Sequence, residues 1–277
     1  MKKILVATDF SNEAYNALYY VTRLFEKENC HFFLLNSYAE HAPLVRLKLA
    51  HETSGLADES MDRLDETYHK IHLDHSNDLH QFTTVSKGET LVESIKDATE
   101  NLNIDLLVLG SKEGAGATAI FKSTQLPEIV DQIKNCPILI VPEEAEIEDL
   151  KEIAFATDYA RSYDAKTLNL FRYLANLTGA RVCVVHVNEE ERLSKAQQSN
   201  RNILQAYLMD IRHTIHWMPD FSTKSKVIKC FLEELNIGML VMIRYEHKLI
   251  PRIFREAVIK KIASELNIPF LILPEGG

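Results

Sequence analysis

The sequence lacks closely spaced cysteines, a feature that would assign it to a disulfide-stapled or zinc-binding class. Its four cysteines, Cys30, Cys136, Cys183 and Cys230, are far apart, and no Cys-x-x-Cys pair occurs. Cys183 lies in the apolar run "VCVV", and Cys136 precedes "PILIV". We therefore expect small, buried cysteine side chains in a reducing compartment, with neither a disulfide framework nor a zinc site.

Basic clusters and long apolar segments are also missing. The net charge is −9 over 277 residues, with no run of lysine or arginine, and this argues against binding to nucleic acid or to an anionic membrane. The start, "MKKILVATDF", has only a short apolar run before Asp9, too short for a signal peptide. Nothing approaches the ~18 apolar residues of a membrane-spanning helix. We therefore expect a cytoplasmic protein.

What the chain does contain is an internal repeat. Four blocks of the first half recur in the same order in the second half. "ILVATDFS" from residue 4 recurs as "IAFATDYA" from residue 153, and "HFFLLNSYAE" from residue 31 recurs as "RVCVVHVNEE" from residue 181. "LNIDLLVLG" from residue 102 recurs as "LNIGMLVMI" from residue 235, and "CPILIVPEE" from residue 136 recurs as "IPFLILPEG" from residue 268. Short apolar strands resemble one another anyway, but the repeated "ATD" and "P-x-L-I-x-P-E" argue against coincidence. The offsets imply about 17 residues missing from the middle of the second copy. The repeat predicts two domains, 1–147 and 148–277.

Within each copy, strand-like and helix-like segments alternate. Short, nearly all-apolar runs such as "ILVA" and "HFFLL" are typical of strands buried on both faces of a parallel sheet. Apolar residues recur at helical spacing from Ala14 to Phe25, with Ser11 or Asn12 as the N-cap, and Pro127 is expected to open another helix. The alternation predicts an α/β fold of two tandem, doubly wound parallel-sheet domains.

The stretch "LVLGSKEGAGATAIFKST", residues 107–124, is the main candidate for a ligand site. Open parallel sheets bind ligands beyond the carboxyl ends of their strands, where the strand order reverses, and we expect Asp9 and this loop to lie there. Glycines let backbone amides approach a phosphate, and a helix N-terminus favours an anion; simple turn formation is the alternative reading. The candidate nucleotide-binding residues are Thr8, Asp9, Leu109, Gly110, Gly114, Gly116, Lys122, Ser123 and Thr124.

These segments resemble the universal stress proteins in their tandem two-domain form, over nearly all of both copies. The resemblance implies a Rossmann-like fold of the adenine nucleotide alpha hydrolase type, with ATP or AMP in the first domain. Nucleotide-binding members carry glycine, two residues, glycine, nine residues, then glycine with serine or threonine. By this resemblance Asp9 contacts the adenosine part, while Gly110, Gly114 and Ser123 line the phosphates. The second glycine comes one residue late, and Lys122 stands in the third glycine's place, where its side chain either blocks a phosphate or pairs with it.

The second copy has lost this loop. Ile243 replaces Gly110, and Arg255–Glu256 stand where a glycine–serine pair is expected. Asp158 survives in "ATDYA", where we expect it to cap the following helix. His186 takes the place of Asn36, with a packing role and a ligand contact as equal alternatives. The resemblance further implies that the two domains pair through their last strands as a pseudo-dimer.

Four histidines, His69, His72, His75 and His80, lie within twelve residues. Histidines three residues apart can share a metal on a helix, but successive steps of three rotate around its axis. An exposed polar face is the reading we favour over a metal site, and the sequence leaves open whether a divalent ion accompanies the nucleotide.

No motif of nucleophilic catalysis appears, because both Gly-x-Ser-x-Gly and the P-loop pattern are missing. The sequence therefore predicts a regulatory protein of the universal stress class rather than an enzyme, with adenine nucleotide as ligand. A nucleotide-independent interaction scaffold is the alternative, followed by a slow nucleotide hydrolase or transferase. A second copy of the chain, forming a homodimer, and an unidentified protein are further candidate partners.

Overall fold

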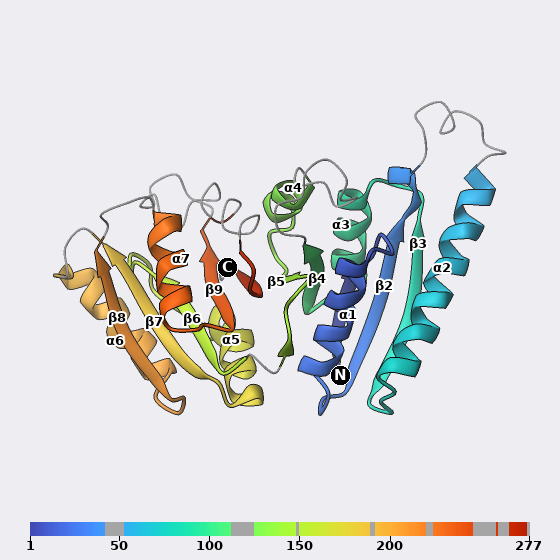
Figure 1. Ribbon diagram of the computed structural model, residues 1–277. Helices are drawn as coiled ribbons and strands as arrows, with labels where there is room; N and C mark the ends of the chain where they lie inside the picture. The colour runs from blue at the N-terminus through green and yellow to red at the C-terminus, as the bar shows by residue number, and fades with distance from the viewer. Residues whose placement is uncertain are drawn as a thin grey trace. The chain divides into compact units, whose positions relative to one another are not determined.

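Figure 1 shows the computed structural model of the chain, which divides into two α/β units. Unit 1 runs from Met1 to Ala145 and unit 2 from Glu146 to Gly277. The structure describes residues 1–41, 53–111, 125–147, 150–188, 192–219, 224–245, 259 and 266–275. Each unit contains five described strands, and all the strand pairs within a unit are parallel.

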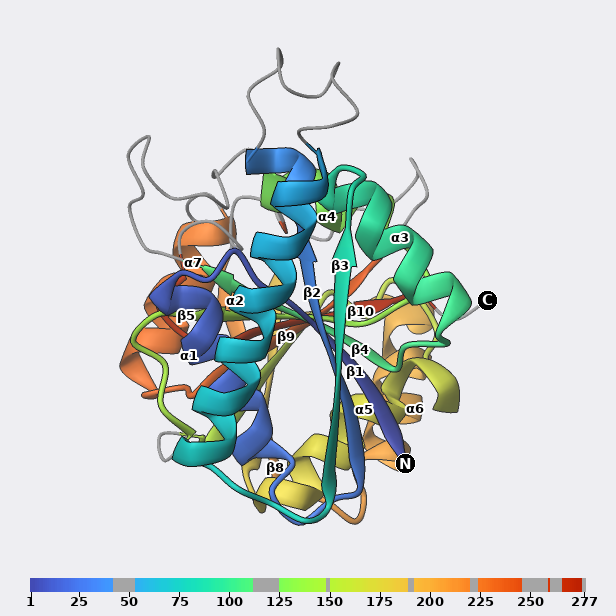
Figure 2. The same ribbon diagram turned by 90° about the vertical axis from the view of Figure 1, so that its right-hand side faces the viewer.

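Unit 1 has the strand order β3-β2-β1-β4-β5. Helices α1 and α2 cover one face of these strands, and α3 and α4 cover the other (Figure 2). The elements are β1 (Lys2–Ala7), α1 (Asn12–Leu24), β2 (Cys30–Ser37), the 3₁₀ turn η1 (Tyr38–His41), α2 (Thr53–Asp74), β3 (His80–Lys87), α3 (Leu91–Asn101), β4 (Leu106–Ser111), α4 (Gln125–Gln132) and β5 (Ile138–Pro142).

Local sequence signals account for these elements. The four residues Ile4–Ala7 of β1 are fully buried, as expected for a strand covered on both faces. Ser11 is the N-cap of α1, and its hydroxyl accepts a hydrogen bond from the Ala14 N–H at 3.2 Å. Pro127 is the third residue of α4, although the sequence predicts it as the first. Proline is tolerated there because the backbone N–H groups of the first helical turn have no partner within the helix.

Unit 2 has the strand order β8-β7-β6-β9-β10, which is the order of unit 1 with each strand replaced by its repeat equivalent. Helix α7 lies on one face of these strands, and α5 and α6 lie on the other. The predicted fold class is therefore confirmed. The elements are β6 (Glu152–Thr157), α5 (Ala165–Thr178), β7 (Arg181–Asn188), α6 (Lys195–Tyr207), β8 (His213–Pro219), α7 (Lys224–Glu234), β9 (Met239–Arg244) and β10 (Phe270–Pro274).

The first helix of unit 2 corrects one expectation. Asp158 does not cap α5; the N-cap is Asp164, whose carboxylate accepts from the Thr167 N–H at 2.7 Å. The helix starts later than its counterpart: the N-cap follows Asp9 by two residues in unit 1 and Asp158 by six residues in unit 2. At its other end, Gly179 has φ 67°, a left-handed conformation that glycine adopts without strain.

The cysteines follow the expectation of burial with one exception. Cys30, Cys136 and Cys183 are buried, and all four thiols are free. Burial raises the pKa of the Cys30 and Cys136 thiols to about 12, so both stay protonated at neutral pH. The prediction was wrong for Cys230, which is exposed because its position on α7 faces solvent while the adjacent Phe231 faces the core.

Candidate functional site

The strand order of unit 1 reverses between β1 and β4, and the candidate residues that the structure describes gather there. Strands β2 and β3 lie to one side of this pair, and β5 lies to the other. Val6 of β1 pairs with Val108 of β4, so Thr8–Asp9 and Leu109–Gly110 reach the same edge of the sheet. We call the edge at which a unit's parallel strands end its carboxyl edge. It is the usual position of a ligand in this class of fold.

A tight turn fixes the carboxylate of Asp9 at this edge. Thr8 and Asp9 are each only 5% exposed. The Phe10 N–H donates to the Thr8 hydroxyl at 2.9 Å, and the Ser11 N–H donates to Asp9 Oδ1 at 3.0 Å. Phe10 has φ 66°, a conformation that is costly for a residue with a large side chain. The turn therefore holds a negative charge beside the N-terminus of α1, where the helix dipole favours it.

A chain of side-chain hydrogen bonds ties the turn to the neighbouring elements. The Asn36 amide donates to the Thr8 carbonyl at 2.7 Å, and the Ser60 hydroxyl donates to Asn36 Oδ1 at 2.8 Å. The Ser86 hydroxyl donates in turn to Ser60 Oγ at 2.8 Å. These bonds connect the ends of β1, β2 and β3 to α2. The sequence did not predict these bonds, although the asparagine directly after the apolar "HFFLL" was a usable signal.

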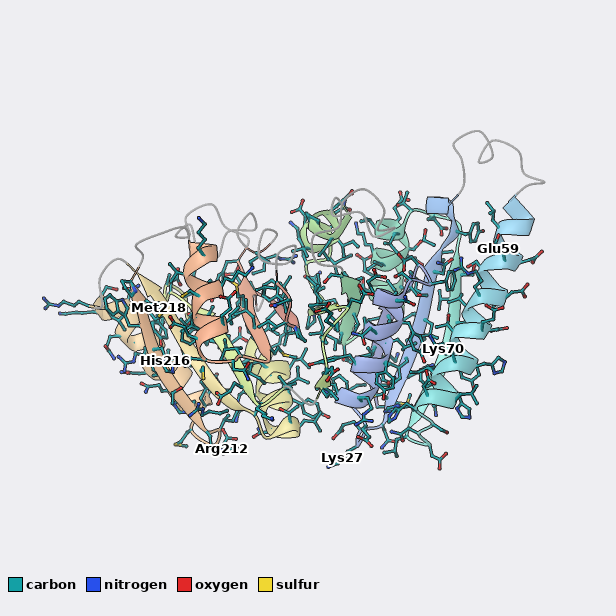
Figure 3. The ribbon with its side chains drawn as sticks, viewed as in Figure 1. Lys27, Glu59, Lys70, Arg212, His216 and Met218 are labelled. Atoms are coloured by element: carbon teal, nitrogen blue, oxygen red, sulfur yellow. The ribbon has the colours of Figure 1, made fainter. Side chains whose placement is uncertain are left out.

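A small cavity opens beside this chain. It has a volume of about 50 Å³, enough for a few waters or one polar substituent but too small for a whole nucleotide. The Arg63 guanidinium lies 4.2 Å from the centroid of the Phe10 ring. Glu59, labelled in Figure 3, projects from α2 at the cavity's end of the helix. The lining residues are Phe10, Asn36, Tyr38, Leu56, Glu59, Ser60 and Arg63.

Gly110 has a packing reason that is independent of any ligand. A Cβ at this position would lie 2.5 Å from the Glu13 carbonyl oxygen and 2.8 Å from the Ala14 nitrogen, both in the backbone of α1. Only glycine lets α1 approach the end of β4 so closely. Leu109, the residue before it, is 1% exposed and is a core residue of β4.

The remaining candidate residues lie outside the part of the chain that the structure describes. They are Gly114, Gly116, Lys122, Ser123 and Thr124. The described chain stops at Ser111, at the end of β4, and resumes at Gln125, at the start of α4. Their roles therefore stay predictions.

Unit 2 keeps the turn at its own carboxyl edge. The Tyr159 N–H donates to the Thr157 hydroxyl at 3.0 Å, and the Ala160 N–H donates to Asp158 Oδ1 at 2.8 Å. Tyr159 has φ 55°, close to the value of Phe10. The "ATD" repeat thus encodes the same backbone turn twice.

Tyrosine side chains fill the space around the second turn. Tyr159, Tyr163 and Tyr245 are 1%, 5% and 8% exposed. The Tyr163 hydroxyl is hydrogen-bonded to the Thr157 hydroxyl. Burial is the main cause that raises the pKa of Tyr245, and the nearby charge of Asp158 raises it further. Burial also raises the pKa of Tyr159, to about 12. These phenols are therefore neutral and belong to the packed interior of unit 2.

Two polar side chains of α6 and one of β7 complete this packing. The Gln197 amide donates to the Asp158 carbonyl at 2.8 Å, and the Asn200 amide donates to the Tyr159 carbonyl at 2.8 Å. His186 Nδ1 lies 3.3 Å from the Thr157 carbonyl oxygen, and its ring lies 4.8 Å from that of Tyr159. His186 thus repeats the Asn36 contact with the turn, as the packing alternative predicts, whereas a ligand contact stays untested.

The four clustered histidines do not share one helix face. His69, His72 and His75 follow one another along α2 and its C-terminal end, while His80 is the first residue of β3. Among the described residues, no three histidine, cysteine, aspartate or glutamate side chains gather closely enough to hold a metal ion.

Comparison with known proteins identifies the family. The model of the universal stress protein family matches residues 1–142. The chain belongs to the universal stress protein family. No curated protein matches the chain significantly. A universal stress protein from Archaeoglobus fulgidus DSM 4304 has a similar structure, with a TM-score of 0.72 and 15% identity over 99% of this chain and 98% of its own.

Two further solved structures match nearly the whole chain. One is a functionally unknown protein from Pseudomonas aeruginosa PAO1, with a TM-score of 0.56 and 12% identity over 99% of this chain and 92% of its own. The other is the cytoplasmic domain of a prokaryotic cation chloride cotransporter, with a TM-score of 0.57 and 10% identity over 99% and 95%. At such low identity, each likeness shows the fold alone. None of the helices described here is long and apolar enough to cross a membrane.

Proposed function

We propose that this universal stress protein is a regulatory module that binds an adenine nucleotide, ATP or AMP, at the carboxyl edge of unit 1. The observation that carries the proposal is the position of Asp9. Its carboxylate is held by the Ser11 N–H at the point where the strand order reverses, and the glycine-containing segment 110–124 follows the neighbouring strand β4 in the sequence. Thr8, Asp9, Gly110 and the loop residues up to Thr124 would form the binding site.

The polar groups at this edge suit different parts of a nucleotide. A carboxylate accepts hydrogen bonds from a ribose hydroxyl or from the adenine amine, and Asp9 is the buried acid at the edge. The loop leads into α4, whose N-terminus offers the partial positive charge that a phosphate requires. The 50 Å³ cavity beside Phe10 would accept a single substituent of the ligand.

In this proposal the second unit does not bind nucleotide. Tyr159, the repeat equivalent of Phe10, and Tyr163 are buried beside its turn, and Ile243 replaces Gly110. The pairing of the two units as a pseudo-dimer and a cytoplasmic location stay predictions. Turnover of ATP is expected to be slow or absent, because no side chain at the described edge is placed as a base to activate water.

The first test is to denature the purified protein and to analyse the released small molecules by mass spectrometry. Co-purified ATP or AMP supports the proposal. An empty protein is then titrated with ATP, with and without Mg²⁺, while its thermal midpoint is measured. A rise in midpoint is expected, since a ligand that binds only the folded state stabilises it. No shift at millimolar ATP would favour the interaction scaffold instead.

The repeat supplies a matched control for the Asp9 side chain. Asp9→Asn keeps an oxygen to accept the Ser11 N–H but removes the charge, and Asp158→Asn makes the same change in unit 2. We expect Asp9→Asn to weaken ATP binding by about tenfold or more, or about 1.4 kcal/mol, and Asp158→Asn to leave it unchanged. Equal losses in both variants would contradict the assignment to unit 1.

A further inference from the structure

Two histidines in unit 1 have a buried ring nitrogen without a hydrogen-bond partner among the described residues. The atoms are His75 Nε2 and His80 Nδ1. The ring centroids lie 6.0 Å apart. A buried polar nitrogen without a partner is destabilising, so two such atoms on neighbouring rings require an explanation.

The tautomer of His80 follows from its other nitrogen. Nε2 lies 3.1 Å from the Phe25 carbonyl oxygen, which can only accept a hydrogen bond, and 3.4 Å from Asn77 Nδ2. The shorter contact, to the carbonyl oxygen, assigns the proton to Nε2. Nδ1 therefore presents a lone pair. An imidazole that donates one N–H to a backbone carbonyl and offers its second nitrogen is the usual arrangement of a metal-binding histidine. His80 is 9% exposed, so this nitrogen is shielded from bulk water.

The surroundings of the pair leave the lone pairs without an alternative partner. The ring of Phe32 meets His80 edge-on at 4.9 Å, and the ring of Tyr19 meets His75 edge-on at 6.4 Å. Asn77 lies between the two histidines in the sequence; its amide donates to the Glu26 carbonyl at 2.7 Å and lies 3.4 Å from His80 Nε2, so its contact with His80 is on Nε2 and not on Nδ1.

The separation of the two rings fits one shared ion. A Zn–N bond is about 2.0–2.1 Å long, and a ring nitrogen lies about 1.1 Å from the centroid of its ring. The centroids of two rings bound to one zinc ion are therefore about 5.2 Å apart at a tetrahedral N–Zn–N angle and about 6.4 Å apart at a linear one. The observed 6.0 Å falls between these limits. Neutral imidazole is a preferred ligand of Zn²⁺ and Cu²⁺.

We propose that His75 and His80 form a two-histidine site for a borderline divalent cation such as Zn²⁺, which ties the C-terminal end of α2 to the start of β3. Water would complete the coordination, because no third protein ligand lies within reach among the described residues. Figures 1 and 2 show this end of α2 beside the start of β3. It is the end of the strands opposite to the carboxyl edge, so the site is independent of the proposed nucleotide site.

The test is a calorimetric titration of the full chain, first stripped with a chelator, with Zn²⁺ alone. We expect one Zn²⁺ per chain, with the affinity falling at least tenfold in His75→Gln and in His80→Gln. His69→Gln, on the exposed face of α2, and His213→Gln, at the first position of β8, are matched controls that should leave it unchanged.

A second measurement keeps the proposal testable if His80→Gln fails to fold. The electron paramagnetic resonance spectrum of the Cu²⁺-loaded protein should show two coordinating nitrogens in the parent chain and one in His75→Gln, with circular dichroism confirming the fold. Absence of Zn²⁺ binding to the parent chain would overturn the proposal. An equal loss of affinity in His69→Gln would also overturn it, because it would show adventitious binding by surface imidazoles.

Discussion

The carboxyl edges of the two units share one turn but differ in what surrounds it. In unit 1, the "ATD" turn is followed at once by α1 and lies beside a small cavity lined by Phe10 and Arg63. In unit 2, the same turn is followed by a longer connection, and Tyr159 and Tyr163 are buried against it. The backbone geometry of the turn is the same in both units, whereas the side chains packed around it differ.

The carboxyl edges of the two units differ at a few positions along the sequence. Because Gly110 has no side chain, α1 begins next to β4. In unit 2 the helix begins four residues later relative to the turn, and the position equivalent to Gly110 holds Ile243, which is 2% exposed. The later helix start, the buried isoleucine and the buried Tyr163 of the longer connection are therefore the features that distinguish the edge of unit 2 from that of unit 1.

The largest expected effect is at Ile243. Ile243→Ala removes a buried side chain from the end of β9 and leaves a cavity, so we expect unfolding of unit 2 to become easier by about 2–5 kcal/mol. Urea unfolding, followed by the fluorescence of Trp217 in unit 2, measures this change. A loss well under 1 kcal/mol would mean that Ile243 is not part of the packed edge.

A substitution at the equivalent position of unit 1, Gly110, should also destabilise its unit, but by less than Ile243→Ala. Gly110→Ala places a Cβ against the backbone of Glu13 and Ala14, and we expect a loss of about 1–3 kcal/mol as α1 is pushed away. Hydrogen exchange of the α1 amides would report the change locally. Unaltered stability would show that the close approach of α1 to β4 does not require glycine.

A smaller effect is expected from the hydroxyl that links the longer connection to the turn. Tyr163→Phe removes the hydrogen bond between Tyr163 and Thr157 and should cost unit 2 about 1 kcal/mol. Tyr68→Phe is the control, since that hydroxyl has no hydrogen bond to a described residue. If the two variants unfold alike, the tyrosine contributes by its ring alone.

The smallest expected effect is on the pH dependence of stability. It compares a histidine at the start of β3, His80, with one at the start of β8, His213. Burial lowers the pKa of His80 below its unfolded value of 6.5, so the unfolded chain takes up the proton more readily. The free energy of unfolding of unit 1 should therefore keep its full value above about pH 6.5. It should fall as the pH drops below 6.5, by less than about 1.4 kcal/mol per pH unit for one proton.

The variants His80→Gln and His213→Gln separate this contribution from the general acid response. With a chelator present, we expect the slope of stability between pH 6.5 and pH 5 to become shallower in His80→Gln and to stay unchanged in His213→Gln. Identical slopes in the parent chain and in His80→Gln would show that the buried ring does not titrate in this range.

Much of the fold could be predicted from the sequence because its signals are local. Buried parallel strands are short apolar runs, and the Ser11 cap and the Gly179 end are single residues with known preferences. The repeated "ATD" located both turns. The cap of α5 was mispredicted because a short insertion moved it from Asp158 to Asp164, and only the three-dimensional start of the helix reveals that shift.

The site was less predictable because its parts come from distant segments. The hydrogen bonds from Asn36 to the turn and from Ser60 to Asn36 join residues that are 28 and 24 positions apart. No local pattern encodes such a contact. Likewise, the approach of His75 to His80 depends on how α2 meets β3, whereas the sequence predicted an exposed polar face for the four clustered histidines.

The central claim is that one edge of the molecule is open to a nucleotide and that its duplicate is filled. The most direct measurement is the number of ATP molecules bound per chain, determined by equilibrium dialysis for the parent chain, Asp9→Asn and Asp158→Asn. The account predicts one ATP per chain, with weakened binding in Asp9→Asn only. Two ATP molecules per chain, or a loss of binding in Asp158→Asn alone, would contradict it.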